Sequence, residues 1–313
     1  TEFEMFRPLV ASPAARAVRH AFFAERAAPR LEGVQSSVKA LNIRKAAVVG
    51  AGYMGSGIAH CLALAGLDVQ VFDSQPAAAS SAVERLLAEP KLAGRHIRAA
   101  QSLEDLADAE LVVEAVVEDL GIKRDLFRRL DLVVSPSAIL ATNTSTLNID
   151  AIARVVSRPE RVIGMHFFGP APVMRLLEVV RGEATSEVVL RTAMELSKRM
   201  RKVAVVSRVG PGFIANRIYT ALMDQALLLA GSGVRPAQID TALERFGWRM
   251  GPFRTMDLIG NDVLIRAREQ GVRLNEGHRL MDRLAEAGRF GQKSGKGWYD
   301  YPADARQGRP SAE

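Results

Sequence analysis

Short apolar, β-branched runs alternate with segments of helical periodicity through the first two thirds of the chain. This alternation is typical of βαβ units, which place their strands side by side in a parallel sheet. The strand-like runs cover residues 46–49, 69–72, 111–115, 139–142, 161–165, 176–180 and 203–206. We therefore predict an α/β domain with a mostly parallel sheet over residues 43–208.

The pattern changes after residue 208 to longer segments with apolar residues at helical spacing. These segments are 218–230, 236–246 and 256–267, with no strand-like run between them. They predict a smaller all-α domain over residues 209–302. Residues 1–42 hold only an amphipathic stretch at 14–26 and a polar linker near 33–39, which predicts an arm. The polar residues 303–313 are expected to fray.

Composition narrows the function classes. The 313 residues suffice for two domains, and no apolar run approaches the roughly 20 residues that span a bilayer. The net charge of +7 comes with scattered arginines and only 6% aromatic residues. This distribution argues against nucleic-acid binding and suits an anionic substrate such as a CoA ester.

The cysteine and histidine positions argue against a secreted protein and against a metal site. Cys61 is the single cysteine, and no charged-then-apolar leader opens the sequence, so we expect a reducing compartment and a cytoplasmic protein. The histidines at positions 20, 60, 96 and 278 show no metal-ligand spacing, and we predict no metal site.

A glycine-rich loop joins the first strand to the first helix of the α/β domain. Gly50-Ala51-Gly52-Tyr53-Met54-Gly55 fits G-x-G-x-x-G, and the next strand ends at Asp73. In a Rossmann-type domain this loop binds a pyrophosphate and the acidic residue accepts the ribose hydroxyls. Ser74 and Gln75 follow rather than arginine, which favours NAD over NADP. The alternative is a plain turn with a helix-capping Asp73. The predicted cofactor contacts are Gly50, Gly52, Tyr53, Met54, Gly55 and Asp73.

Four further segments carry a resemblance. They are Asn143-Thr144-Ser145, Gly164-Met165-His166-Phe167-Phe168-Gly169-Pro170, Leu176-Leu177-Glu178 and Pro211-Gly212-Phe213-Ile214-Ala215-Asn216-Arg217. Together with the glycine loop they closely resemble the 3-hydroxyacyl-CoA dehydrogenase family over residues 43–301. The resemblance implies NAD-dependent oxidation of L-3-hydroxyacyl-CoA to 3-oxoacyl-CoA in fatty-acid β-oxidation.

Such an oxidation needs a base that removes the hydroxyl proton, and histidine suits this role near neutral pH. His166 is the expected base, and Glu178 on a neighbouring run is expected to orient it. The resemblance further implies that Ser145 and Asn216 hydrogen-bond the substrate oxygen. It also implies that Glu118, Lys123 and Asn143 contact cofactor and substrate.

Each of these residues has a structural alternative. His166 fits a buried structural histidine, and Ser145 fits the cap of a helix at 149–156. Glu178 fits a surface ion pair with Arg175, and Asn216 fits a helix-capping or solvated amide.

Other segments resemble one branch of the family. Residues 22–26 resemble the linker of multifunctional β-oxidation enzymes, and residues 246–254 and 287–299 resemble the peroxisomal bifunctional branch. A hydratase/isomerase portion is therefore expected in the parent enzyme, and a peroxisome is the alternative compartment. Two departures stand out: Gly169, where single-function relatives usually carry Asn, and a segment after Asp73 that is shorter than in the family and has one expected helix at 77–88.

The resemblance leaves an assembly and two other functions open. Multifunctional relatives carry a second helical domain, and we expect a homodimer to take its place through the helix that carries Ile218, Leu222, Met223 and Leu227. One alternative function is a β-hydroxyacid dehydrogenase, which relies on a catalytic lysine. The other is a catalytically silent dinucleotide-binding protein with a structural role, as in the lens.

Overall fold

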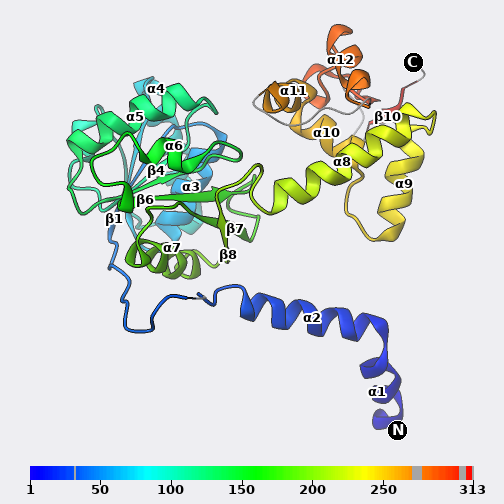
Figure 1. Cartoon of the computed structure of the whole chain (residues 1–313), viewed down its shortest axis with the longest axis horizontal. Coiled ribbons are helices and arrows are strands. Elements are labelled where there is room, and N and C mark those ends of the chain that lie inside the picture. The colour runs from blue at the N-terminus through cyan, green and yellow to red at the C-terminus, as the bar shows by residue number, and fades with distance from the viewer. Residues whose placement is uncertain (32, 270–276, 303–307, 312–313) are drawn as a thin grey trace. The chain divides into compact units, whose positions relative to one another are not determined.

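The computed structural model describes residues 1–31, 33–269, 277–302 and 308–311 (Figure 1). The chain forms two compact units, Thr1–Phe213 and Ile214–Glu313. The predicted tail at 303–313 lies largely outside the described residues, since only 308–311 belong to them.

The first unit is built on a sheet of eight strands in the order β3-β2-β1-β4-β5-β6-β7-β8. All neighbours are parallel except β6 and β7, which confirms the mostly parallel α/β fold. The first part of this order, with β1 central and crossovers to both sides, is the arrangement of dinucleotide-binding folds. The strands are β1 (Lys45–Val49), β2 (Asp68–Phe72), β3 (Ile97–Ala99), β4 (Leu111–Glu114), β5 (Ile139–Thr142), β6 (Val162–Phe167), β7 (Leu176–Arg181) and β8 (Val203–Arg208).

Helices cover both faces of the sheet, so its strands are buried on two sides. In β1, Ala46 and Val48 join one apolar cluster, whereas Ala47 and Val49 join the other. The first cluster takes in α3 (Tyr53–Leu64), α4 (Pro76–Leu87) and α7 (Glu187–Arg199), and the second takes in α5 (Leu120–Val133) and α6 (Ile149–Ala153). Short 3-10 turns lie at η1 (Pro90–Leu92), η2 (Glu104–Leu106) and η3 (Pro159–Arg161).

The segment after Asp73 holds more than the single helix expected from the sequence. Helix α4 matches the expected helix at 77–88, but β3 was not predicted. This strand has three residues, and only Ile97 among them is β-branched. Because β3 pairs with β2 at the edge of the sheet, long-range pairing rather than local pattern makes it a strand.

The second unit is mainly helical but differs from the sequence prediction in two places. The predicted helix at 256–267 is wrong: two helices, α10 and α11, meet at Gly260, whose φ is 102°. A small antiparallel pair, β9 with β10, also occurs where no strand was expected. The elements are α8 (Ala215–Gly231), α9 (Pro236–Phe246), α10 (Pro252–Ile259), α11 (Asn261–Glu269), α12 (His278–Glu286), η4 (Gln292–Ser294), β9 (Tyr299–Asp300) and β10 (Arg309–Pro310).

Two buried carboxylates tie the helical unit together. Asp240 accepts hydrogen bonds from the backbone N–H groups of Phe253 and Arg254 at the start of α10. Asp257 accepts them from the N–H groups of Trp298 and Tyr299, at 2.8 and 2.9 Å. Burial raises the pKa of both carboxyl groups, although these hydrogen bonds oppose the shift.

The N-terminal arm consists of α1 (Glu2–Ala11) and α2 (Pro13–Ala27), and neither helix has a buried residue. Helix α2 matches the expected stretch at 14–26, whereas α1 was not expected. Ser12 caps α2 by accepting a hydrogen bond from the N–H of Ala15. Within the described residues, no helix has the length and apolar character that a bilayer crossing needs.

Candidate active site

The glycine loop between β1 and α3 has the shape that a dinucleotide requires. A Cβ at Gly55 would lie 1.7 Å from the carbonyl oxygen of Gly50, so a side chain is excluded there. Gly52 caps α3, and no atom lies within 4 Å of the place its Cβ would take. Helix N-termini that follow such a glycine loop bind pyrophosphate in dinucleotide-binding folds.

Asp73 follows β2 directly and reaches back to this loop. Its Oδ2 accepts a hydrogen bond from the N–H of Ala51 at 2.8 Å, and its Oδ1 accepts one from the N–H of Gln75 at 2.9 Å. The carboxylate is therefore held against the glycine loop, as is the ribose-binding acidic residue of Rossmann-type domains. Its charge opposes a 2'-phosphate.

His166 and Glu178 form a buried pair on adjacent strands. The two residues lie opposite each other in the β6–β7 register, with His166 Nδ1 2.7 Å from Glu178 Oε2. Their exposed fractions are 5% and 1%. The surface pair considered for Glu178 is wrong, because Arg175 bonds Glu25 instead.

Two aromatic rings lie beside the imidazole of His166. The ring of Phe168 lies 4.4 Å away and that of Phe213 lies 5.7 Å away, measured between centroids. This apolar surrounding lowers the local dielectric constant and strengthens the interaction with Glu178. The pair is thus a fixed unit at the carboxyl end of β6.

The Ser145 loop follows β5 and is held by Glu118. Glu118 Oε1 accepts its two shortest hydrogen bonds from Thr144 Oγ1 at 2.6 Å and Ser145 N at 2.8 Å, and Ser145 Oγ lies 3.2 Å away. Burial alone would raise the pKa of Glu118, but the charge of Lys123 and these donors lower it overall. The alternative of Ser145 as a helix cap is wrong, because Asn148 caps α6.

Lys123 and Asn143 both brace this end of the sheet. Lys123 is only 1% exposed, and its Nζ lies 2.5 Å from Glu114 Oε1 and 3.4 Å from Glu118 Oε2. Asn143 Oδ1 accepts a hydrogen bond from the N–H of Phe167 at 2.8 Å. Asn143 therefore links the end of β5 to the residue after His166.

Asn216 belongs to the helical unit. It is the second residue of α8, and the N-cap of that helix is Ile214. The helix-capping alternative for Asn216 is therefore wrong.

Comparison with known proteins follows the same two units. The family description "3-hydroxyacyl-CoA dehydrogenase, NAD binding domain" matches residues 45–210, and "3-hydroxyacyl-CoA dehydrogenase, C-terminal domain" matches residues 212–301. The chain belongs to the 3-hydroxyacyl-CoA dehydrogenase family. The predicted family, the enzyme class of NAD-dependent dehydrogenases and the cofactor NAD are thereby confirmed.

Similar proteins include both long and short members. The dehydrogenase is 40% identical to the peroxisomal bifunctional enzyme of Danio rerio, over 96% of this chain and 46% of that protein. It is 38% identical to a probable 3-hydroxybutyryl-CoA dehydrogenase of Bacillus subtilis (strain 168), over 83% of this chain and 98% of that protein. The chain thus spans about half the length of the first of these relatives.

A solved structure shares the fold of the dehydrogenase. The crystal structure of (S)-3-hydroxybutyryl-CoA dehydrogenase PaaH1 from Ralstonia eutropha is 34% identical, with a TM-score of 0.75. The match covers 83% of this chain and 100% of that one.

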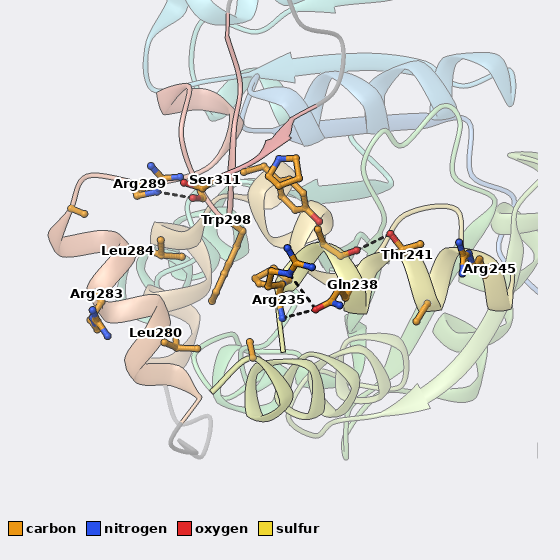
Figure 2. A pocket seen from close by; sticks show the side chains of 18 residues that line it. Arg235, Gln238, Thr241, Arg245, Leu280, Arg283, Leu284, Arg289, Trp298 and Ser311 are labelled. Carbon is orange, nitrogen blue, oxygen red and sulfur yellow. Dashed lines mark hydrogen bonds between the residues drawn. The ribbon is translucent and has the colours of Figure 1, made fainter. Parts of the chain in front are cut away.

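A separate hollow of about 1110 Å³ lies in the helical unit (Figure 2). Arg235, Arg245 and Arg283 border it, and Leu280 and Leu284 contribute apolar surface. Its described lining includes none of the predicted site residues, so the size of the hollow alone does not locate the catalytic chemistry.

Proposed function

We propose that this chain carries out the NAD-dependent oxidation of L-3-hydroxyacyl-CoA to 3-oxoacyl-CoA, with His166 as the base. The observation that carries the proposal is the buried His166–Glu178 pair at the carboxyl end of β6. Ligands in open α/β sheets bind at this edge, and the Ser145 loop and the glycine loop lie at the same ends of parallel strands.

The pair defines the proton's path. A carboxylate only accepts hydrogen bonds, so Glu178 takes the proton-bearing Nδ1 of His166 as its donor. Nε2 is then left with a lone pair, and it removes the proton from the substrate hydroxyl. Glu178 stabilises the resulting imidazolium, as the carboxylate of a Ser-His-Asp triad does.

The remaining residues bind and orient. NAD, when bound, accepts the hydride that leaves the carbinol carbon. The residues that would hold it are Gly50, Gly52, Tyr53, Met54, Gly55 and Asp73. Glu118, Lys123 and Asn143, which the resemblance implies as further contacts, would also brace the neighbouring loops. The hydroxyl of Ser145 has a single proton, which Glu118 Oε1 accepts at 3.2 Å. Once this hydroxyl turns away from Glu118, it donates a hydrogen bond to the oxygen that becomes the ketone. Asn216 is the second donor that the family resemblance implies.

The test is NADH consumption by the purified chain with acetoacetyl-CoA, followed by absorbance, with NADPH as the control. Turnover that prefers NADH supports the reaction. NADH binding without turnover contradicts it and favours the silent structural protein. Turnover of a simple β-hydroxyacid that survives His166→Ala favours the lysine-dependent dehydrogenase instead.

We propose a hydratase/isomerase portion in the parent protein, and a cytoplasmic or peroxisomal location, since relatives of both bacterial and peroxisomal description match.

The residues expected at the homodimer contact differ in exposure. Leu227 is 1% exposed and Met223 packs against the core of the helical unit, whereas Ile218 is 65% exposed. The proposed contact therefore centres on Ile218. A clean monomer in light scattering at high concentration contradicts this contact.

A further inference from the structure

A buried ion pair, Glu114 with Lys123, is bonded to the loops of the candidate active site. Glu114 is the last residue of β4 and has no exposed surface, and Lys123 of α5 is 1% exposed. Their Oε1 and Nζ atoms are 2.5 Å apart. Removing two charges from water is costly, and their attraction offsets this cost only in good geometry with further hydrogen bonds.

Those further bonds are present, and they lead to the loop after β5. Glu114 Oε1 accepts a hydrogen bond from the N–H of Val116 at 2.7 Å, and its Oε2 accepts one from Thr142 Oγ1 at 2.6 Å. Thr142 Oγ1 also lies 3.3 Å from the N–H of Thr144. Glu114 is therefore bonded to the strand that delivers Asn143 and Ser145.

Glu114 is also connected to the Ser145 loop through Lys123. Lys123 Nζ lies 3.4 Å from Glu118 Oε2, while Glu118 Oε1 holds the Ser145 loop. Glu118 is thus placed between a buried cation and a set of loop donors. When Glu114 loses its charge, Lys123 keeps Glu118 as its carboxylate partner in the described ion pairs. We expect Lys123 then to draw Glu118 away from Ser145.

We propose that Glu114 is a positioning residue of the active site, which acts through Lys123 and Glu118 to fix the backbone of Ser145, and with it the place of the Ser145 side chain beside the substrate oxygen. The inference rests on the proposed function, in which Ser145 donates to that oxygen. Glu114 itself contacts neither substrate nor cofactor in this scheme. A purely structural ion pair would stabilise the fold without any specific link to Ser145.

A double-mutant cycle separates these two roles. The four proteins are the wild type, Glu114→Gln, Ser145→Ala and the double variant, assayed for kcat and KM with acetoacetyl-CoA and NADH. Glu114→Gln should lower kcat by about tenfold or more, since misplacement of a catalytic group by about 1 Å has such effects. In the Ser145→Ala background the same change should cost less than about twofold, because the two residues act on one interaction.

A control variant shows whether loss of any carboxylate has the same effect. Asp108→Asn removes a carboxylate that pairs with Lys45 at 2.8 Å but is half exposed, and it should leave kcat unchanged. If Glu114→Gln does not fold, Glu114→Gln with Lys123→Met removes both charges and replaces it in the cycle.

The outcomes distinguish the positioning role of Glu114 from the proposed dehydrogenase reaction. Equal losses from Glu114→Gln in both backgrounds would overturn the positioning role while leaving the reaction intact. Wild-type kcat in the variant lacking both charges would also overturn it. A wild type that binds NADH but does not turn over acetoacetyl-CoA would instead contradict the proposed function.

Discussion

His166 and Glu178 face each other across β6 and β7, the antiparallel neighbours in the described sheet. Directly opposed residues in an antiparallel pair have their side chains on the same face and close together. The register thus brings Nδ1 and Oε2 to 2.7 Å without help from a loop. Glu178 faces His166 because β7 runs antiparallel to β6. If β7 ran parallel to β6, its residues would follow one another in the reverse order along β6.

Replacing His166 separates a catalytic base from a structural histidine. His166→Ala should lower turnover by roughly 10² to 10⁴ and leave NADH binding nearly intact, because the base acts in the chemical step. Steady-state kinetics and NADH fluorescence titration measure the two effects.

Glu178→Gln provides the matched variant. It keeps the shape of the side chain but removes the charge that stabilises the imidazolium, so kcat should fall while KM changes little. An equal loss of NADH affinity in both variants would instead indicate that the pair only supports the fold.

Asp73 should decide the cofactor. Asp73→Asn removes the charge beside the glycine loop, so NADH affinity should fall and the preference for NADH over NADPH should narrow. Each change should be about tenfold or more, since a hydrogen bond to a charged group contributes about 1.5–3 kcal/mol. Asp68→Asn, at the exposed start of β2, is the control. Unchanged NADH binding in Asp73→Asn would place the ribose elsewhere.

The sequence predicts this fold well where the pattern is local. The glycine loop, Asp73 and the runs that became β1, β2, β4, β5, β6, β7 and β8 all carry their own signal. β3 does not, since Ile97 alone is apolar and branched, and its pairing with β2 makes the strand. Gly260 ends the first of the two helices within the predicted helix at 256–267, and a glycine is a helix-ending residue that the sequence shows. The apolar periodicity on both sides of it nevertheless favoured one continuous helix.

The sequence predicted which residues belong to the candidate site but not which side chains contact one another. From the sequence alone, Glu178 could form an ion pair with Arg175, and Ser145 could cap a helix. Strand register and loop geometry, which decide between these alternatives, cannot be read from residue spacing. Glu114 was missed altogether. Its one signal is a charged residue at the end of an otherwise apolar strand, where a buried carboxylate needs a cation from elsewhere in the fold.

Acidification should release the Ser145 loop only well below neutral pH. Because the pKa of Glu118 is lowered from its ordinary value of 4.5, its stabilising contribution is complete above that value and is lost as the pH falls through the lower folded-state pKa. The difference in urea midpoint between wild type and Glu118→Gln should therefore stay constant from about pH 8 to pH 5 and close below about pH 4.5. A difference that closes near pH 6 contradicts the lowered pKa.

Asp257 should be a stability residue of the helical unit. Asp257→Asn replaces an acceptor for two backbone N–H groups with an amide whose NH₂ faces a donor, and unfolding should become easier by about 2–3 kcal/mol. Urea denaturation of the full chain measures this loss. Glu286→Gln, at the exposed end of α12, is the control and should stay within about 0.5 kcal/mol of the wild type. Equal midpoints for the two variants would show that Asp257 contributes nothing specific.

Two glycines of one loop should respond differently to the same substitution. At Gly52 the backbone φ of −69° suits any residue and no atom lies within 4 Å of an added Cβ, so Gly52→Ala should fold normally. Its methyl group occupies the space assigned to the pyrophosphate, and NADH affinity should fall by about tenfold or more, since the backbone must approach the pyrophosphate closely.

At Gly55 the added Cβ would lie 1.7 Å from the carbonyl oxygen of Gly50, which is backbone and cannot turn aside. Gly55→Ala should therefore lower the thermal midpoint as well as NADH binding, because strand β1 and helix α3 must separate to admit the methyl group. Thermal unfolding and NADH titration of both variants test the contrast. If Gly52→Ala bound NADH as the wild type does, the open space at the start of α3 would not be the pyrophosphate site, and the cofactor would have to approach the loop from another side.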